Sequence, residues 1–131
     1  MAGELILIVE DNEKNRKLAR DVLQFTGYRT IESETAEEGI RLAREQQPAL
    51  ILMDIQLPGM NGIEALGRLR ADPRTAAIPV MAVTASAMTH DRQKIMAAGF
   101  DGYQSKPINV KEFLQAVRDL LDRGRGAGGG A

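Results

Sequence analysis

Short apolar runs alternate along this chain with longer segments of helical period, and this alternation limits the fold more than any other feature. Residues 5–9, 50–53 and 80–83 are apolar throughout, as expected for strands covered on both faces. Weaker strands are expected at 28–32 and 102–105, and helices at 13–26, 35–47, 63–72, 87–98 and 110–121. Five repeats of strand and helix predict an α/β fold, a doubly wound five-stranded parallel sheet with helices on both faces.

The spacing of apolar residues predicts which helix faces are buried. In the first helix these residues are Leu18, Ala19, Val22 and Leu23. In the last they are Val110, Phe113, Leu114, Val117, Leu120 and Leu121. The second helix begins with a capping box at 35–38 and contains Gly39, which costs helix stability.

The composition fits one domain that is neither secreted nor basic. The chain has 131 residues, 44% of them apolar, which suffices for a hydrophobic core. A net charge of -1 and scattered arginines argue against nucleic-acid binding. The absence of cysteine excludes disulfides, and the N-terminal apolar run is too short for a signal peptide or membrane span. We expect a cytoplasmic protein with a domain at 4–123 and a flexible Gly-rich tail at 124–131.

Polar residues stand where the apolar runs end. Glu10 and Asp11 follow the first run, Asp54 the second and Thr84 the third, and Lys106 follows the short segment 102–105. The carboxyl ends of parallel strands meet at one edge of a sheet, where ligands bind. Three carboxylates brought together there would suit Mg²⁺. Taken singly, each residue also fits an ordinary role, as an acid at a helix N-terminus, a loop cap, a strand-end hydroxyl or a surface cation.

The same set of residues suits phosphoryl chemistry. Asp54 is a candidate nucleophile that could hold a phosphoryl group as an acyl phosphate. Thr84 could donate to a phosphoryl oxygen, and Lys106 is a compact cation suited to the same role. Pro107 allows a cis peptide that would fix the direction of Lys106. Tyr103 is either a core aromatic or a residue that swings between inside and outside.

These motifs, in this order and spacing, resemble those of response-regulator receiver domains over residues 4–123. The resemblance rests on Glu10-Asp11, Asp54 with Pro58 and Asn61-Gly62, Thr84-Ala85 and Lys106-Pro107. It implies a flavodoxin-like (βα)5 fold with strand order 2-1-3-4-5. It also implies that Asp11, Asp54 and the backbone carbonyl of Gln56 bind Mg²⁺, with Glu10 acting through a water.

The resemblance further implies a switch. Asp54 would accept a phosphoryl group from a histidine kinase or a phosphotransfer protein, while Thr84 and Lys106 contact it. Thr84, Tyr103 and Pro107 would then alter a face made by the fourth helix, fifth strand and fifth helix, where a downstream protein binds. The protein would be a monomer or weak dimer, and a signalling switch rather than a turnover enzyme.

Within the family, the motifs are most similar to those of the stand-alone cell-division regulators of α-proteobacteria, the DivK type. One departure is Ser86, where that type tends to have Phe, which bears on the lifetime of the phosphoryl group. Alternatives are a receiver excised from a larger hybrid kinase or diguanylate cyclase, and an adapter that takes no phosphate. A Mg²⁺-dependent phosphatase with an Asp nucleophile is disfavoured, because such enzymes carry a second acid at the position of Gln56.

Overall fold

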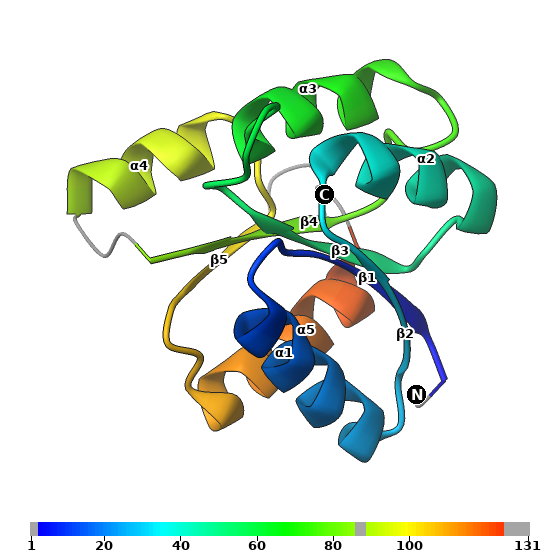
Figure 1. Cartoon of the computed structure of the whole chain (residues 1–131), viewed down its shortest axis with the longest axis vertical. Helices are drawn as coiled ribbons and strands as arrows, with labels where there is room; N and C mark the ends of the chain where they lie inside the picture. Colours follow the sequence, from blue (N-terminus) through cyan, green and yellow to red (C-terminus); the bar gives the residue numbers. More distant parts are fainter. Residues whose placement is uncertain (1–2, 86–88, 125–131) are drawn as a thin grey trace.

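The computed structural model describes residues 3–85 and 89–124, in which strands and helices alternate along the chain (Figure 1). The strands are β1 (Leu5–Val9), β2 (Arg29–Ser33), β3 (Leu50–Asp54), β4 (Val80–Thr84) and β5 (Gly102–Ser105). The helices are α1 (Glu13–Thr26), α2 (Ala36–Gln46), α3 (Gly62–Ala71), α4 (Thr89–Ala97) and α5 (Val110–Arg123). Three predictions concern residues outside the described ranges: the departure at Ser86, the first two residues of the helix predicted at 87–98, and the tail beyond Gly124.

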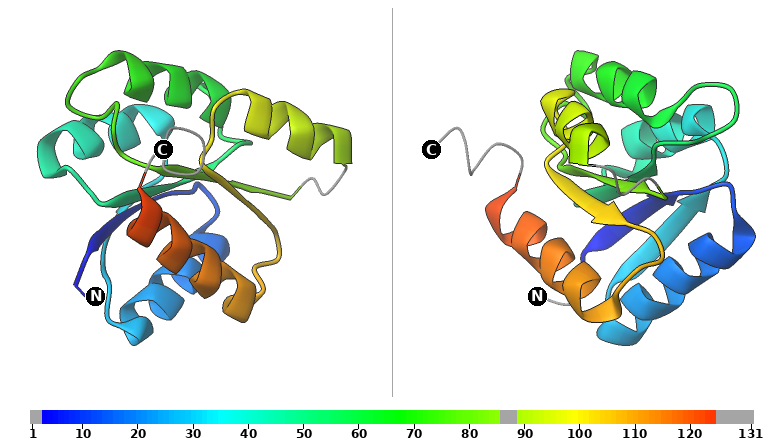
Figure 2. Two further views of the ribbon diagram at one scale, coloured as in Figure 1. Left: turned by 180° about the vertical axis from the view of Figure 1, so that it is seen from behind. Right: turned by 90° about the vertical axis from the view of Figure 1, so that its left-hand side faces the viewer.

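The strands form one parallel sheet in the order β2-β1-β3-β4-β5, which confirms the predicted fold. Helices α1 and α5 cover one face, and α2, α3 and α4 cover the other (Figures 1 and 2). For α1 to α4 this division follows from right-handed crossovers, because the chain reverses its direction of travel across the sheet after β2. No helix within residues 3–85 and 89–124 is long and apolar enough to cross a membrane.

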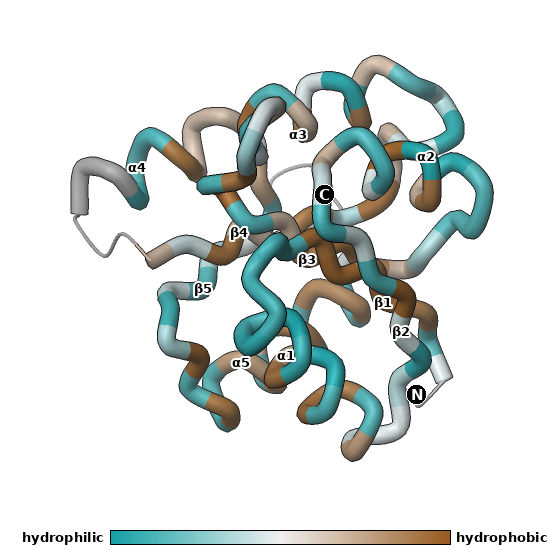
Figure 3. Tube along the Cα trace, in the orientation of Figure 1, coloured by the Kyte–Doolittle hydropathy of each residue, from teal (hydrophilic) through white to brown (hydrophobic). Residues whose placement is uncertain are grey.

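The sheet divides the hydrophobic core into two layers. Leu7, Val9, Ile51 and Met53 face α2, α3 and α4, whereas Ile6, Ile8, Leu50 and Leu52 face α1 and α5. All residues of β3 and β4 are buried, as expected for central strands, and Figure 3 shows the apolar colour concentrated there.

Two residues expected on buried helix faces are instead exposed. Leu18 on α1 is 40% exposed and Val110 on α5 is 46% exposed, while Ala19, Leu23 and Phe113 are buried as predicted. The apolar stripes of these helices are wider than the sheet surface that they cover, so their rims reach solvent. Phe25, near the end of α1, is 94% exposed.

Four helices begin at a side-chain cap. Asn12, Asn61 and Asn109 accept a hydrogen bond through Oδ1 from the backbone N–H three residues later, and Thr35 does so through Oγ1. Each cap satisfies a donor that the first turn of a helix leaves without an intrahelical partner. The caps at Asn12 and Asn61 stand shortly after β1 and β3, so they fix how the chain leaves the edge of the sheet where the polar residues gather.

Gly39 is explained by close packing between α2 and β1. A methyl group at this position would lie 2.7 Å from Cγ2 of Val9, so only glycine allows this approach. The cost in helix propensity is about 1 kcal/mol relative to alanine, and burial of the surrounding α2 residues, including Ile40 and Ala43, offsets it.

The opposite edge of the sheet, where β4 begins, is fastened by an ion pair. Arg70 of α3 donates through Nη2 to Oδ2 of Asp101 at 2.6 Å and through Nη1 to the carbonyl of Ile78 at 2.7 Å. The same Asp101 oxygen accepts the backbone N–H of Val80 at 2.9 Å. Both charged side chains are mostly buried, so one carboxylate joins the end of α3, the start of β4 and the segment before β5.

Candidate functional site: an acidic cluster at the carboxyl edge of the sheet

The strand registers bring the predicted site residues to one edge. Val9 pairs with Met53, so Glu10 is level with Asp54. Asp54 itself pairs with Val83, and Thr84 pairs with Ser105 directly before Lys106. Residues far apart in the sequence therefore converge, as the alternation of strands and helices predicted.

Three carboxyl groups meet there. Glu10, Asp11 and Asp54 each offer an oxygen, and these oxygens lie within 4.8 Å of one another. Glu10 and Asp54 are buried, at 5% and 3% exposure, whereas Asp11 is exposed. The cluster thus combines a buried pair of carboxyl groups with one that faces solvent.

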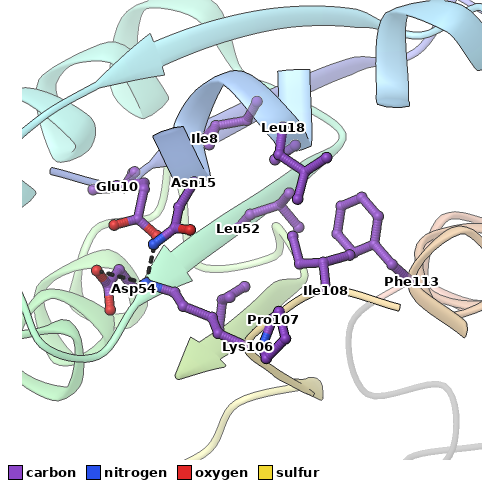
Figure 4. A pocket seen from close by; sticks show the side chains of 13 residues that line it. Ile8, Glu10, Asn15, Leu18, Leu52, Asp54, Lys106, Pro107, Ile108 and Phe113 are labelled. Carbon is purple, nitrogen blue, oxygen red and sulfur yellow. Dashed lines mark hydrogen bonds and ion pairs between the residues drawn. The ribbon is translucent and has the colours of Figure 1, made fainter. Parts of the chain in front are cut away.

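Lys106 supplies a positive charge inside this cluster. Its Nζ lies 2.6 Å from Oε1 of Glu10 and 3.2 Å from Oδ2 of Asp54. Figure 4 shows the side chain running from the Pro107 end of the loop toward both carboxyl groups. The backbone N–H of Lys106 donates to the carbonyl of Thr84 at 2.8 Å, and the Lys106–Pro107 peptide is cis.

Burial and neighbouring charges shift the pKa values of two groups in the cluster, Glu10 and Lys106. Burial, followed by hydrogen bonding to Asp54, raises the pKa of Glu10 to about 7, although Lys106 acts in the opposite direction. For Lys106, burial alone would lower the pKa, but the bonds and charges of Glu10 and Asp54 outweigh it and raise the pKa. The pKa shifts thus favour the charged form of Lys106 and the neutral form of Glu10.

The carboxyl groups of Asp54 and Glu10 are also oriented by the backbone. Oδ1 of Asp54 accepts the N–H of Gln56 at 3.0 Å, and Oε2 of Glu10 accepts the N–H of Asn12 at 3.1 Å. The N–H of Gly62 donates to the carbonyl of Ile55 at 3.1 Å, which draws the start of α3 against the end of β3. The role of the Gln56 carbonyl as a metal ligand stays a prediction.

The residues predicted to act as a switch lie beside the cluster. Thr84 is buried at the end of β4, and Tyr103 is half-buried on β5, packed against the core layer beneath α4. The guanidinium of Arg92, on α4, lies 5.3 Å from the centre of the Tyr103 ring, within the range of a cation–π interaction.

A small cavity of about 40 Å³ adjoins the site between α1 and α5. Its polar end is formed by Glu10, Asn15, Asp54 and Lys106, and its apolar end includes Leu18 and Phe113 (Figure 4). The space suits water rather than an organic molecule.

The donor set fits a hard divalent cation. Carboxylate oxygens are the ligands that Mg²⁺ prefers, usually one or two of them together with waters and phosphate oxygens. The pKa of Glu10 is raised first by burial and then by the neighbouring Asp54, so the ionised form of Glu10 is disfavoured without a further cation. A divalent cation would favour the ionised form of all three acids.

Sequence patterns missed two contacts. Arg16 of α1 reaches the backbone carbonyl of Glu10, and Arg92 of α4 reaches Tyr103. In the sequence each is one basic residue among several on an exposed helix, so nothing in the pattern distinguishes them.

Comparison with known proteins settles the family. The model for the response regulator receiver domain matches residues 6–118. This chain belongs to the response regulator receiver domain family. The resemblance inferred from its motifs is therefore confirmed, and receiver domains are signalling switches in two-component systems.

Among curated proteins, this receiver is similar to the polar-differentiation response regulators DivK of Brucella ovis and Brucella suis. With each it is 47% identical over 116 residues, which span 88% of this chain and 94% of the relative. The finer likeness to the DivK type is thus also confirmed.

Solved structures share the fold. The receiver domain of sensor histidine kinase PA1611 from Pseudomonas aeruginosa PAO1 has a TM-score of 0.85 and 32% identity, covering 92% of this chain and 99% of the other. That structure holds a magnesium ion coordinated in its active site cleft. A putative response regulator from Chloroflexus aurantiacus has a TM-score of 0.88 and 26% identity over the same shares of the two chains.

Proposed function

We propose that this receiver accepts a phosphoryl group on Asp54 and uses the resulting charge to alter its contacts with other proteins. The observation that carries the proposal is the position of the Lys106 ammonium, between Asp54 and Glu10 at the carboxyl edge of the sheet. A buried carboxylate beside a fixed cation and two further acids is suited to phosphoryl transfer rather than to simple structural capping.

The donor would be a phosphohistidine on a histidine kinase or a phosphotransfer protein. An oxygen of Asp54 attacks phosphorus, the P–N bond breaks, and its electron pair stays on the imidazole nitrogen. Catalysis of this kind rests on positioning and on neutralising charge at the phosphoryl oxygens. Lys106 is placed to compensate that charge, and the N–H of Gln56 holds Asp54 in one orientation.

Asp11 and Asp54, with the Gln56 carbonyl, would hold Mg²⁺ directly, and Glu10 would hold it through a water. When bound, the ion would supply positive charge to the phosphoryl oxygens. The acid cluster and the magnesium in the related P. aeruginosa receiver support this assignment.

The output would be a changed protein surface. Thr84 would move toward the phosphoryl group, Tyr103 would turn inward, and Pro107 would keep the following loop in register with Lys106. A downstream partner would then read the face formed by α4, β5 and α5, to which Tyr103 belongs. We assign this switch to residues 4–123 and place its action in the cytoplasm, as a signal carrier without turnover of a substrate.

The direct test is labelling with a small phosphodonor in the presence of Mg²⁺. The wild type should take up the label and Asp54→Asn should not. The control is Asp21→Asn, which removes an exposed carboxylate of α1 far from the cluster and should label as the wild type does. Label retained in Asp54→Asn would refute the assignment of the phosphoacceptor.

A further inference from the structure

We propose that Arg16 is a positioning residue that holds the backbone of Glu10 and Asp11, and thereby sets the geometry of the acidic cluster. This inference deepens the proposed function, since it concerns the metal site assigned there. Arg16 lies on the first turns of α1 and is not itself one of the acids or a group that would touch phosphate.

The contacts run from the guanidinium to the chain just after β1. Nη1 of Arg16 donates to the carbonyl of Glu10 at 3.0 Å and approaches the carbonyl of Asp11 at 3.5 Å. The first is a good hydrogen bond and the second is at the limit of one. The Arg16 side chain is only 16% exposed, so this is a fixed contact rather than a mobile surface group.

A second carboxylate holds the other side of the guanidinium. Nε of Arg16 lies 3.2 Å from Oε1 of Glu32 on β2. A planar guanidinium has several donors in a rigid fork, so it can bind a carboxylate and a carbonyl at the same time. Arg16 therefore ties the loop after β1 to the edge strand β2.

Glu32 also matters for charge. A bare cation beside the cluster would compete with a metal ion for the acids. Because Glu32 is paired with Arg16, it compensates part of the positive charge that the clamp brings near Glu10 and Asp11. Arg20, one turn later on α1, binds the same Glu32 at 3.3 Å through Nη1, and its hydrogen bonds in the described chain go to Glu32 and Asp21.

The effect should fall mainly on Asp11. The Glu10 side chain is already held by Lys106 and by the N–H of Asn12. The Asp11 carboxyl is exposed, so the direction in which it points depends on the backbone that carries it. Release of that backbone would spread the Asp11 oxygens over more positions and weaken a site that needs them near Asp54.

The test compares Arg16→Gln and Arg16→Lys with the matched control Arg20→Gln, which loses a bond to Glu32 but none to the loop. In metal-free protein, amide hydrogen exchange followed by NMR should speed up several-fold at residues 10–12 in Arg16→Gln, because the local structure opens more often. Calorimetric titration should show Mg²⁺ affinity lower by about three- to tenfold, at or below the range for loss of an outer-shell partner. Arg16→Lys, which keeps the charge but not the fork, should recover only a small part of either effect.

Unchanged amide exchange at residues 10–12 in Arg16→Gln would overturn the proposal. Tighter Mg²⁺ binding in this variant would also overturn it, because the loss of a positive charge near the acids would then explain the change in affinity. An equal loss in Arg20→Gln, or wild-type behaviour of Arg16→Lys, would overturn it as well. If the wild type itself bound no Mg²⁺, the metal site would fail instead, and the exchange data on metal-free protein would still decide whether Arg16 holds the loop.

Discussion

Gly62 and Gly67, both on α3, should respond in opposite ways to the same substitution. Gly62 is the buried first residue of the helix, and a methyl group there would lie 2.6 Å from the carbonyl oxygen of Asp54 and 2.9 Å from Cα of Ile55. Both are backbone atoms, which cannot rotate away as a flexible side chain would. Gly67 is exposed, and a methyl group there would meet nothing within 4 Å.

The expected magnitudes follow from these surroundings. Gly62→Ala forces the end of β3 and the start of α3 apart, and overpacking of this kind costs about 1–3 kcal/mol of unfolding free energy. Gly67→Ala relieves the poor helix propensity of glycine and should gain about 0.8–1 kcal/mol. The two variants should therefore differ by roughly 2–4 kcal/mol, taking these two ranges together.

Urea unfolding followed by circular dichroism measures both free energies, and labelling by a small phosphodonor with Mg²⁺ measures the site. Gly62→Ala should also label more slowly, because the displaced atoms belong to Asp54 and the residue after it, whereas Gly67→Ala should label as the wild type does. Equal stability of the two variants would refute the reasoning from close packing. Normal labelling in a destabilised Gly62→Ala would show that Asp54 tolerates the displacement.

Three further predictions concern charge and packing. Lys106→Ala should still accept phosphate, though more slowly, but its affinity for a partner should no longer respond to phosphorylation; a response of wild-type size in a binding assay would contradict the coupling. Because the pKa of Glu10 is raised from 4.5 to about 7, its stabilising contribution is present below pH 4.5 and is lost as the pH rises through 7. The unfolding free energy of metal-free protein, measured in urea, should therefore fall between pH 5 and pH 8. Over the same range the Mg²⁺ affinity, measured by calorimetry, should rise. The variant Glu10→Gln should show a weaker pH dependence of both quantities. Phe25→Ser, at a position 94% exposed, should change the unfolding free energy by less than about 0.5 kcal/mol, whereas Phe113→Ala, at a fully buried position, should cost about 3–5 kcal/mol, both read from urea midpoints.

The sequence predicted β1, β3 and β5 to the residue but placed the edge strand β2 less well. Residues 5–9, 50–54 and 102–105 match these three strands, while β2 runs from Arg29 to Ser33 rather than from 28 to 32. The strands β1 and β3 are bounded by their apolar runs, but the half-exposed strand β2 has no such boundary. Tyr28 is buried against the layer of α1 and α5 without belonging to the strand, so its apolar character misled the assignment.

For the site, convergence could be predicted and the finer contacts could not. Glu10, Asp54 and Lys106 come together because parallel strands carry their last residues to one edge, which is a property of the chain order. The reach of Arg16 to a carbonyl and of Arg92 to Tyr103 depends on how two helices are set against the sheet. Helical periodicity places these residues on an outer face, and only the tertiary arrangement shows what lies within their reach.

The ion pair of Arg70 with Asp101 has a consequence for how this protein can change over time. The strands are fastened by charge at the edge where β4 begins, while the opposite edge carries crowded acids that oppose one another. The Arg70–Asp101 contacts and the reactive acids therefore lie at opposite ends of the sheet. Substitutions in the loops around Asp54 leave the contacts of Arg70 with Asp101 intact, so the two ends of the strands can change independently except where packing is close, as at Gly62.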